Sequence, residues 1–300
     1  MHLFLRRHWL GLVGASSIVG CRAAGARTRE PGRESYPAFR AAHPSALLEP
    51  APGPARFDNA ALDARLSAVQ WSGPLGPMRG WLALPEGDGP FPGLVWLHGA
   101  FAASWEQFEP LGAAFPPPDF AVFIPTWRGE NGNPGERELL AGELDDAVAA
   151  VRWFSQRAEV DASRMFALGH SAGGALSALL ALIPDLPLRE TASVGGIYVP
   201  QTFARWAKTE HNGPLVRFDA NDPNEGRLRT LQGNVPDLLR PHIAYVGHDD
   251  PWFHPNVEQM KDAASASGAP FEAAFVEGDH MSSLVSGYTK YLARIRGAAS

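Results

Sequence analysis

Hydrophobic positions fall into short runs and longer amphipathic stretches from Leu66 to the end of the chain. Residues 66–71 and 78–84 alternate between apolar and polar side chains, which predicts a pair of strands joined by a turn. Other short apolar runs predict further strands, and the continuously apolar ones are typical of parallel strands buried on both faces. These runs are residues 93–97, 121–125, 165–168, 194–199, 243–246 and 271–276.

Three segments between or after these runs predict helices. In residues 138–154 the apolar side chains recur at the helical period. A stretch rich in alanine and leucine follows Ser171, and residues 284–295 place apolar side chains on one face of a closing helix. Repeated alternation of strand and helix predicts the α/β class, with a mostly parallel sheet that helices cover on both faces.

The first 20 residues differ in pattern from the rest of the chain. They combine a basic start with a short apolar run, which predicts a secretory signal peptide too short to span a bilayer as a helix. Residues 18–21 read Ile-Val-Gly-Cys and resemble the lipobox of bacterial lipoproteins. We therefore expect residues 1–20 to be removed and Cys21, the one cysteine, to be lipidated. The alternative is a plain secretory signal with a chance cysteine.

Residues 21–60 are rich in Ala, Arg, Pro and Gly without a sustained period, which predicts a flexible tether before a single domain at 61–300. We expect an exported protein held at a membrane through its N-terminal lipid only, with the domain in water. A hydrophobic fraction of 45% supplies a large core. The net charge of −6 gives no electrostatic footprint for nucleic acid.

The strongest chemical motif is Gly-His-Ser-Ala-Gly at residues 169–173, between a predicted strand and a predicted helix. A G-x-S-x-G nucleophile elbow places the serine on a strained turn that exposes its hydroxyl, and flanking glycines let strand and helix approach closely. We predict Ser171 as the nucleophile. A glycine-rich turn with a bystander serine is the alternative interpretation.

The partners of this serine follow it in the order that such folds require, acid and then histidine. Residues 243–246 end in Gly247-His248-Asp249-Asp250, and catalytic groups gather at the carboxyl ends of strands. We predict Asp250 as the acid, with Asp249 as its competitor and Asp219 or Asp222 as weaker ones. His280 follows the last predicted strand and is the expected base.

An oxyanion hole needs two backbone N–H groups near the nucleophile. The N–H of Ala172 is one, because it begins the helix after the serine. The second is predicted at Ala100 or Phe101, after the strand that ends at Leu97, since Gly99 lets the backbone come close. We expect His98 to support this loop rather than to act in catalysis.

Taken together, these residues resemble the α/β-hydrolase superfamily over about residues 66–296. The closer likeness is to its prolyl-oligopeptidase and dienelactone-hydrolase branch, and it is carried by residues 127–132, 143–146 and 160–164. The resemblance implies an eight-stranded core and the triad Ser171–Asp250–His280. It also implies that the protein needs no metal and no organic cofactor.

The expected activity is hydrolysis of small or medium esters by a carboxylesterase, with a serine-type peptidase acting on short peptides as the alternative. A third possibility is a binding or scaffold protein that kept the fold and lost turnover. Residues 200–240 could form a small lid whose Phe203, Trp206 and Phe218 line an acyl pocket, or these rings could be ordinary packing. Arg128 could bind a substrate carboxylate or form an ion pair with the helix of Asp145 and Asp146.

Overall fold

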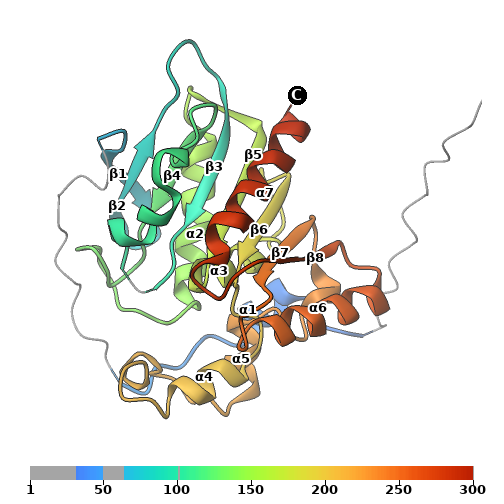
Figure 1. The fold of residues 1–300 in the computed structure, drawn as a ribbon. Helices are drawn as coiled ribbons and strands as arrows, with labels where there is room; N and C mark the ends of the chain where they lie inside the picture. Colours follow the sequence, from blue (N-terminus) through green and yellow to red (C-terminus); the bar gives the residue numbers. More distant parts are fainter. Residues whose placement is uncertain (1–31, 50–63, 101, 300) are drawn as a thin grey trace, which may run out of the picture.

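The computed structural model describes residues 32–49, 64–100 and 102–299. In this part of the chain, eight strands form one sheet, shown in Figure 1. The strands are β1 (Ser67–Gly73), β2 (Gly76–Ala83), β3 (Phe91–Leu97), β4 (Ala121–Pro125), β5 (Val160–His170), β6 (Glu190–Val194), β7 (His242–Gly247) and β8 (Phe271–Val276).

The strands are ordered β1-β2-β4-β3-β5-β6-β7-β8 across the sheet. β2 is antiparallel to both β1 and β4, whereas the pairings from β4 through β8 are parallel. This confirms the predicted fold class, an α/β fold of the α/β-hydrolase type with a mostly parallel eight-stranded sheet. Parallel strands bring their carboxyl ends to one edge, where ligands bind in such sheets.

Helices cover both faces of the sheet. They are α1 (Tyr36–Ala42), α2 (Gly142–Ser155), α3 (Ala172–Leu180), α4 (Gln201–Trp206), α5 (Pro223–Arg229), α6 (His254–Ser267) and α7 (Ser283–Ala299). Side chains of α2, α3 and α6 pack into one hydrophobic cluster, and those of α7 into a second one on the opposite face. Along β3, Val95 and Leu97 belong to the first cluster, and Leu94 and Trp96 to the second. This alternation explains why the strand is apolar throughout.

The strand predicted at 194–199 is misplaced. β6 ends at Val194, and the chain then leaves the sheet through Gly195, which has φ of 57°. Ile197 and Tyr198 are fully buried although they pair with no strand. The apolar run therefore reflects burial in the core, which periodicity alone does not separate from strand pairing.

The prediction of a flexible tether over 21–60 is wrong for residues 32–49. Helix α1 buries the rings of Tyr36 and Phe39, and the Tyr36 hydroxyl donates a hydrogen bond to the Leu228 carbonyl over 2.6 Å. A helix of seven residues spans only two turns, so its apolar positions are too few to reveal a period. Cys21 and the expected signal peptide lie outside the described residues.

Residues 200–240 form the predicted excursion, which carries α4, α5 and two short 3-10 turns. Phe203 and Phe218 are almost fully buried, with ring centroids 5.6 Å apart, and Trp206 packs edge-on against Phe203. These rings pack against one another within the excursion, and none of them lines the cavity bordered by Ala100 and Ala172. No helix in the described ranges is both long and apolar enough to cross a membrane.

Candidate active site

Ser171 occupies the sharp turn between the end of β5 and the start of α3. Its backbone angles, φ 53° and ψ −116°, are strained for a residue with a Cβ. A Cβ on Gly169 would collide with the backbone of Gly173, and a Cβ on Gly173 would collide with the carbonyl of Leu97. Both flanking positions therefore need glycine, as the elbow motif predicts.

His280 and Asp250 reach Ser171 from the loops after β8 and β7. His280 Nε2 lies 3.0 Å from Ser171 Oγ, and His280 Nδ1 lies 3.1 Å from Asp250 Oδ2. Although Ser171 and His280 are 109 residues apart in the sequence, both follow parallel strands of one sheet. The structure thus joins the three residues predicted as nucleophile, base and acid into one hydrogen-bonded chain.

Asp250 is held as a buried carboxylate. Its Oδ1 accepts hydrogen bonds from the backbone N–H groups of Trp252 and Phe253, each over 3.0 Å. Burial alone would raise the pKa of Asp250, but hydrogen bonds from His280 and these N–H groups outweigh it and lower the pKa below its ordinary value. The competing Asp249 is exposed.

Asp219 and Asp222, the weaker candidates for the acid, have local structural roles. Asp219 accepts a hydrogen bond from the backbone N–H of Asn221 over 2.9 Å. Asp222 caps the N-terminus of α5 by accepting the N–H of Asn224 over 2.8 Å. Both carboxylates therefore serve the excursion instead of His280.

His170 supports the imidazole of His280, a role that the sequence did not indicate. The two rings stack with centroids 5.0 Å apart, and His170 Nε2 lies 3.0 Å from the His280 carbonyl oxygen. Burial, together with the charge of a protonated His280, lowers the pKa of His170 to about 4. His170 is therefore neutral near pH 7, and its Nε2–H can donate to that carbonyl.

The loop after β3 lies against the elbow, as predicted. A Cβ built on Gly99 would stand 3.2 Å from the His170 carbonyl oxygen and 3.5 Å from Ser171 Cβ. Ala100 has φ of 55°, and it lines the same small cavity as Ala172. Ala100 and Ala172, whose N–H groups are the expected oxyanion donors, thus border one cavity. Phe101 lies outside the described residues.

His98 supports the loop after β3 from within the core. It is fully buried, and its Nε2 lies 2.8 Å from Glu130 Oε1, which also accepts the backbone N–H of Trp127 over 2.8 Å. Burial would lower the pKa of His98, but the Glu130 carboxylate and its hydrogen bond raise it above the ordinary value. The ring of His98 stacks on that of Trp127, so the loop after β3 and the loop after β4 are tied together.

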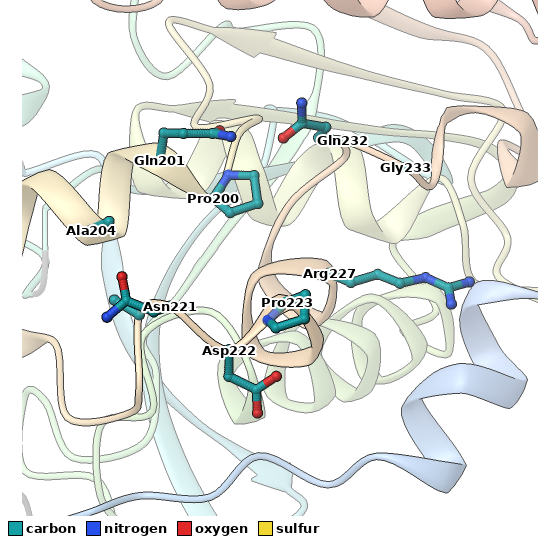
Figure 2. A pocket seen from close by; sticks show the side chains of 10 residues that line it. Pro200, Gln201, Ala204, Asn221, Asp222, Pro223, Arg227, Gln232 and Gly233 are labelled. Carbon is teal, nitrogen blue, oxygen red and sulfur yellow. The ribbon is translucent and has the colours of Figure 1, made fainter.

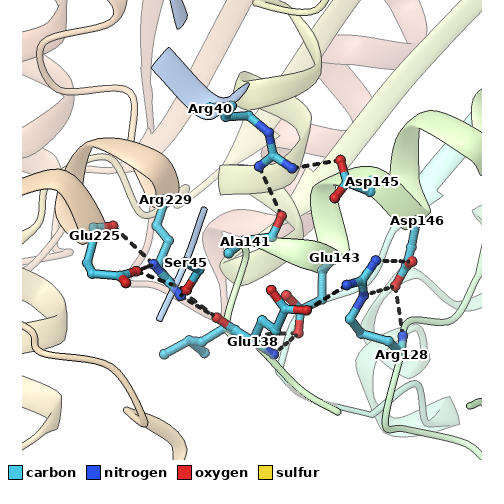
Figure 3. A network of polar contacts seen from close by, with 11 residues as sticks. Arg40, Ser45, Arg128, Glu138, Ala141, Glu143, Asp145, Asp146, Glu225 and Arg229 are labelled. Carbon is cyan, nitrogen blue, oxygen red and sulfur yellow. Dashed lines mark hydrogen bonds and ion pairs between the residues drawn. The ribbon is translucent and has the colours of Figure 1, made fainter. Parts of the chain in front are cut away.

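Arg128 belongs to a buried polar network and is not free to bind a substrate carboxylate (Figure 3). It donates to both oxygens of Asp146, over 2.9 and 3.1 Å, and to Glu138 Oε1 over 2.6 Å. Asp145 instead accepts a hydrogen bond from Arg40 of α1 over 2.6 Å. The structural ion pair is therefore the correct interpretation of Arg128.

A pocket of about 450 Å³ opens in the excursion at residues 200–240, as Figure 2 shows. Pro200, Asp222 and Arg227 are among its walls, but none of Ser171, Asp250 and His280 lines it. Arg227 extends toward α1, where its guanidinium lies 3.9 Å from the ring centroid of Phe39. In the described ranges, no three His, Cys, Asp or Glu side chains are placed to hold a metal ion.

Comparison with known families matches residues 92–248 to a family described as alpha/beta hydrolase fold. Among curated proteins, an uncharacterized peptidase of Bacillus subtilis, YtmA, is 28% identical over 120 residues, which cover 40% of this chain and 47% of that protein. An alpha/beta hydrolase domain-containing protein of Arabidopsis thaliana, WAV2, is 27% identical over 57% of each chain. The match thus spans about half the length of these curated relatives.

Among solved structures, an esterase of Pyrococcus furiosus superposes with a TM-score of 0.66 at 16% identity, over 83% of this chain and 97% of the esterase. At this level of identity the likeness shows the shared fold alone. The three comparisons agree with the described geometry on an α/β-hydrolase fold.

Proposed function

Because the chain belongs to the alpha/beta hydrolase family, we propose that it is a serine hydrolase, a carboxylesterase that acts on small esters. One observation carries the proposal: Ser171 Oγ, His280 and Asp250 are linked by contacts of 3.0 and 3.1 Å. A serine hydroxyl is a weak nucleophile until an oriented base accepts its proton, and this arrangement supplies that base.

In the proposed reaction, His280 Nε2 takes the proton of Ser171 as Oγ attacks the ester carbonyl. The backbone N–H groups of Ala172 and Ala100 would stabilise the oxyanion, a contribution of about 3–4 kcal/mol for each donor. His280 then protonates the departing alcohol, and a water activated by the same imidazole releases the acid. Asp250 keeps the proton on Nδ1 and stabilises the imidazolium.

Labelling with a fluorophosphonate tests this proposal directly. The reagent phosphonylates a serine only where a base activates it, so wild-type protein should be labelled on Ser171 and the Ser171→Ala variant should not. The adduct is mapped by mass spectrometry. Folded wild-type protein that stays unlabelled would identify a non-catalytic binding protein and overturn the proposal.

A serine-type peptidase is the second candidate, because the Bacillus subtilis relative is named a peptidase. Amide cleavage uses the same acyl-enzyme, so the triad alone does not separate the two activities. Aryl esters and short peptide anilides with the same acyl group should be assayed in parallel. A kcat/KM for the anilide within about tenfold of the ester value would favour the peptidase.

We also propose that the mature protein is exported and anchored by lipid on Cys21. The lipobox-like residues 18–21 support this, and a single acyl chain binds membranes only weakly, so stable anchoring needs more than one chain. Wild-type protein should incorporate radiolabelled palmitate in a bacterial host, and the Cys21→Ser variant should not. Equal incorporation by both would exclude Cys21 as the anchor.

A further inference from the structure

A small cavity lies directly beside the elbow. Its volume is about 20 Å³, and a space of this kind holds one or two heavy atoms. Its walls comprise the two residues expected to supply oxyanion donors, three leucines, a tryptophan and three charged residues. These residues are Ala100 and Ala172, then Leu139, Leu140 and Leu176, then Trp127, then Glu130, Arg137 and Glu143. Ala172 immediately follows Ser171, so the cavity borders the place where an acyl group on Ser171 would lie.

Two of the residues that line the cavity each carry a buried polar atom without a hydrogen-bond partner. Glu143 is only 5% exposed, and its Oε1 accepts the backbone N–H groups of Glu138 and Leu139 over 2.8 and 3.1 Å. Its Oε2 is buried without a partner, and so is Nε of Arg137. Buried polar groups are usually hydrogen-bonded, so an open acceptor and an open donor on two residues of one cavity favour a polar ligand there.

The loop that carries these walls is fixed by contacts from distant segments (Figure 3). Arg229 donates to the Glu138 carbonyl over 2.9 Å, and Arg40 of α1 donates to the Ala141 carbonyl over 3.0 Å. Leu139 and Leu140 have φ of 53° and 77°, a strained conformation that such contacts help to maintain. The backbone on both sides of Leu139 and Leu140 is therefore held in place, and so is Glu143, whose Oε1 accepts two N–H groups of this loop.

We propose that this cavity is the acyl subsite and takes a two-carbon acyl group with a hydroxyl on C2. The hydroxyl would donate to Glu143 Oε2 and accept from the Nε–H of Arg137. This inference rests on the proposed function. It names the substrate class as esters of short 2-hydroxy acids, which water cleaves to the hydroxy acid and the alcohol.

Other substituents of this size satisfy the walls less well. A methyl group would leave both polar atoms without a partner in a desolvated site, which is costly. An ammonium group has no lone pair for the Nε–H of Arg137, and a carboxylate would stand against the carboxylate of Glu143. A hydroxyl is both donor and acceptor, so one small group bonds to both walls.

The test compares ethyl glycolate with ethyl propionate, which have acyl groups of the same number of heavy atoms. The glycolate-to-propionate ratio of kcat/KM values is divided by the same ratio of hydroxide-catalysed rates. This normalisation removes the higher intrinsic reactivity of the glycolate ester. Wild-type enzyme should prefer glycolate by about 10- to 100-fold, as expected for a hydrogen bond to a charged group. Glu143→Gln should bring this normalised ratio to within about threefold of 1 while keeping both backbone bonds to Oε1.

The ratio should also depend on pH. Burial raises the pKa of Glu143 to about 7, so the carboxylate that accepts the hydroxyl proton is formed increasingly above pH 7. The charged groups that face or adjoin it are Asp146 on its own helix, Glu138, Arg137 and Glu130 from the neighbouring loops, and Arg229 from α5. Any effect of pH on the catalytic triad is common to both esters and cancels in their ratio. The ratio should rise from pH 6 to pH 8 in wild type and stay flat in Glu143→Gln.

Two further variants complete the design. Arg137→Met keeps the length of the side chain without its donor and should also lower the ratio, whereas Glu258→Gln on the exposed face of α6 should leave it unchanged. Thermal melting shows whether each variant is folded. Suppose that Ser171 reacts with a fluorophosphonate but the wild-type ratio lies near 1. This inference is then wrong and the proposed function stands. The same conclusion follows if the wild-type ratio is high but neither Glu143→Gln nor Arg137→Met lowers it. Absence of labelling would remove the proposed function itself.

Discussion

Replacing Asp250 by asparagine tests whether Asp250, and not the adjacent Asp249, orients the imidazole of His280. The carboxylate has two different tasks: Oδ1 accepts the N–H groups of Trp252 and Phe253, and Oδ2 faces His280 Nδ1. In Asp250→Asn, the amide oxygen should keep the position of Oδ1, because the reverse orientation would set its NH2 group against two N–H donors. The amide nitrogen then faces Nδ1 and donates to it.

This donation forces the wrong tautomer. With Nδ1 as acceptor, the proton of His280 lies on Nε2, which then has no lone pair for the Ser171 hydroxyl. The loss in kcat/KM should be about 10⁴-fold, which corresponds to ~5.5 kcal/mol of transition-state stabilisation. Because both backbone hydrogen bonds survive, the variant should fold and its melting temperature should change little.

The assay is hydrolysis of p-nitrophenyl acetate, with the rate of fluorophosphonate labelling as a second measure of the nucleophile. Asp249→Asn is the matched control: its side chain is exposed, and its activity should stay within about twofold of wild type. An Asp250→Asn variant that keeps a tenth of the activity, with a strongly impaired Asp249→Asn, would refute the assignment of the acid.

Three other substitutions test the surroundings of the site. Asp146→Asn should lower the free energy of unfolding by about 3–5 kcal/mol in urea titrations, because it leaves the buried Arg128 without its main counter-charge; a change below 1 kcal/mol would contradict this. Tyr36→Ala should lower the free energy of unfolding by about 3–5 kcal/mol, and Tyr36→Phe by only about 1 kcal/mol. A loss of about 1 kcal/mol in both variants would show that α1 contributes little to stability. Burial lowers the pKa of His242 to about 3. As the pH falls below about 6.5, the unfolded chain therefore binds a proton at this residue before the folded protein does. Between pH 6 and pH 4 this difference alone removes about 1.4 kcal/mol of stability per pH unit. His242→Gln should therefore show a shallower loss of melting temperature over this range, and an unchanged slope would exclude the residue as a source of acid sensitivity.

Much of the fold could be predicted because its strands are short, apolar and separated by helices of clear period. The elbow could be predicted as well, since the steric demand for Gly169 and Gly173 appears directly in the sequence. The order of serine, acid and histidine then selected Asp250 and His280 from strand ends. Chain order is preserved in the sequence, and the parallel sheet converts it into proximity.

The strand predicted at 194–199 and the tether show where such reasoning stops. In both stretches the apolar or irregular pattern is explained by contacts with residues far along the chain. The backbone N–H of Tyr36 donates to Asp237 over 3.0 Å, across 201 residues of sequence. No local period encodes a contact of that separation, because only the assembled core supplies the partner.

The walls of the acyl cavity belong to the same class of feature. Glu143 was visible only as part of a family-like segment, and its open oxygen arises because Oε1 is engaged by the loop at 138–139. That loop is in turn held by Arg229, which also donates to the hydroxyl of Ser45 over 2.6 Å. Residues expected to form a passive tether therefore help to shape the wall beside the nucleophile. We therefore expect selectivity at this site to depend on the N-terminal segment as well as on the triad. Ser45→Ala should change the glycolate-to-propionate ratio more than it changes the rate of fluorophosphonate labelling.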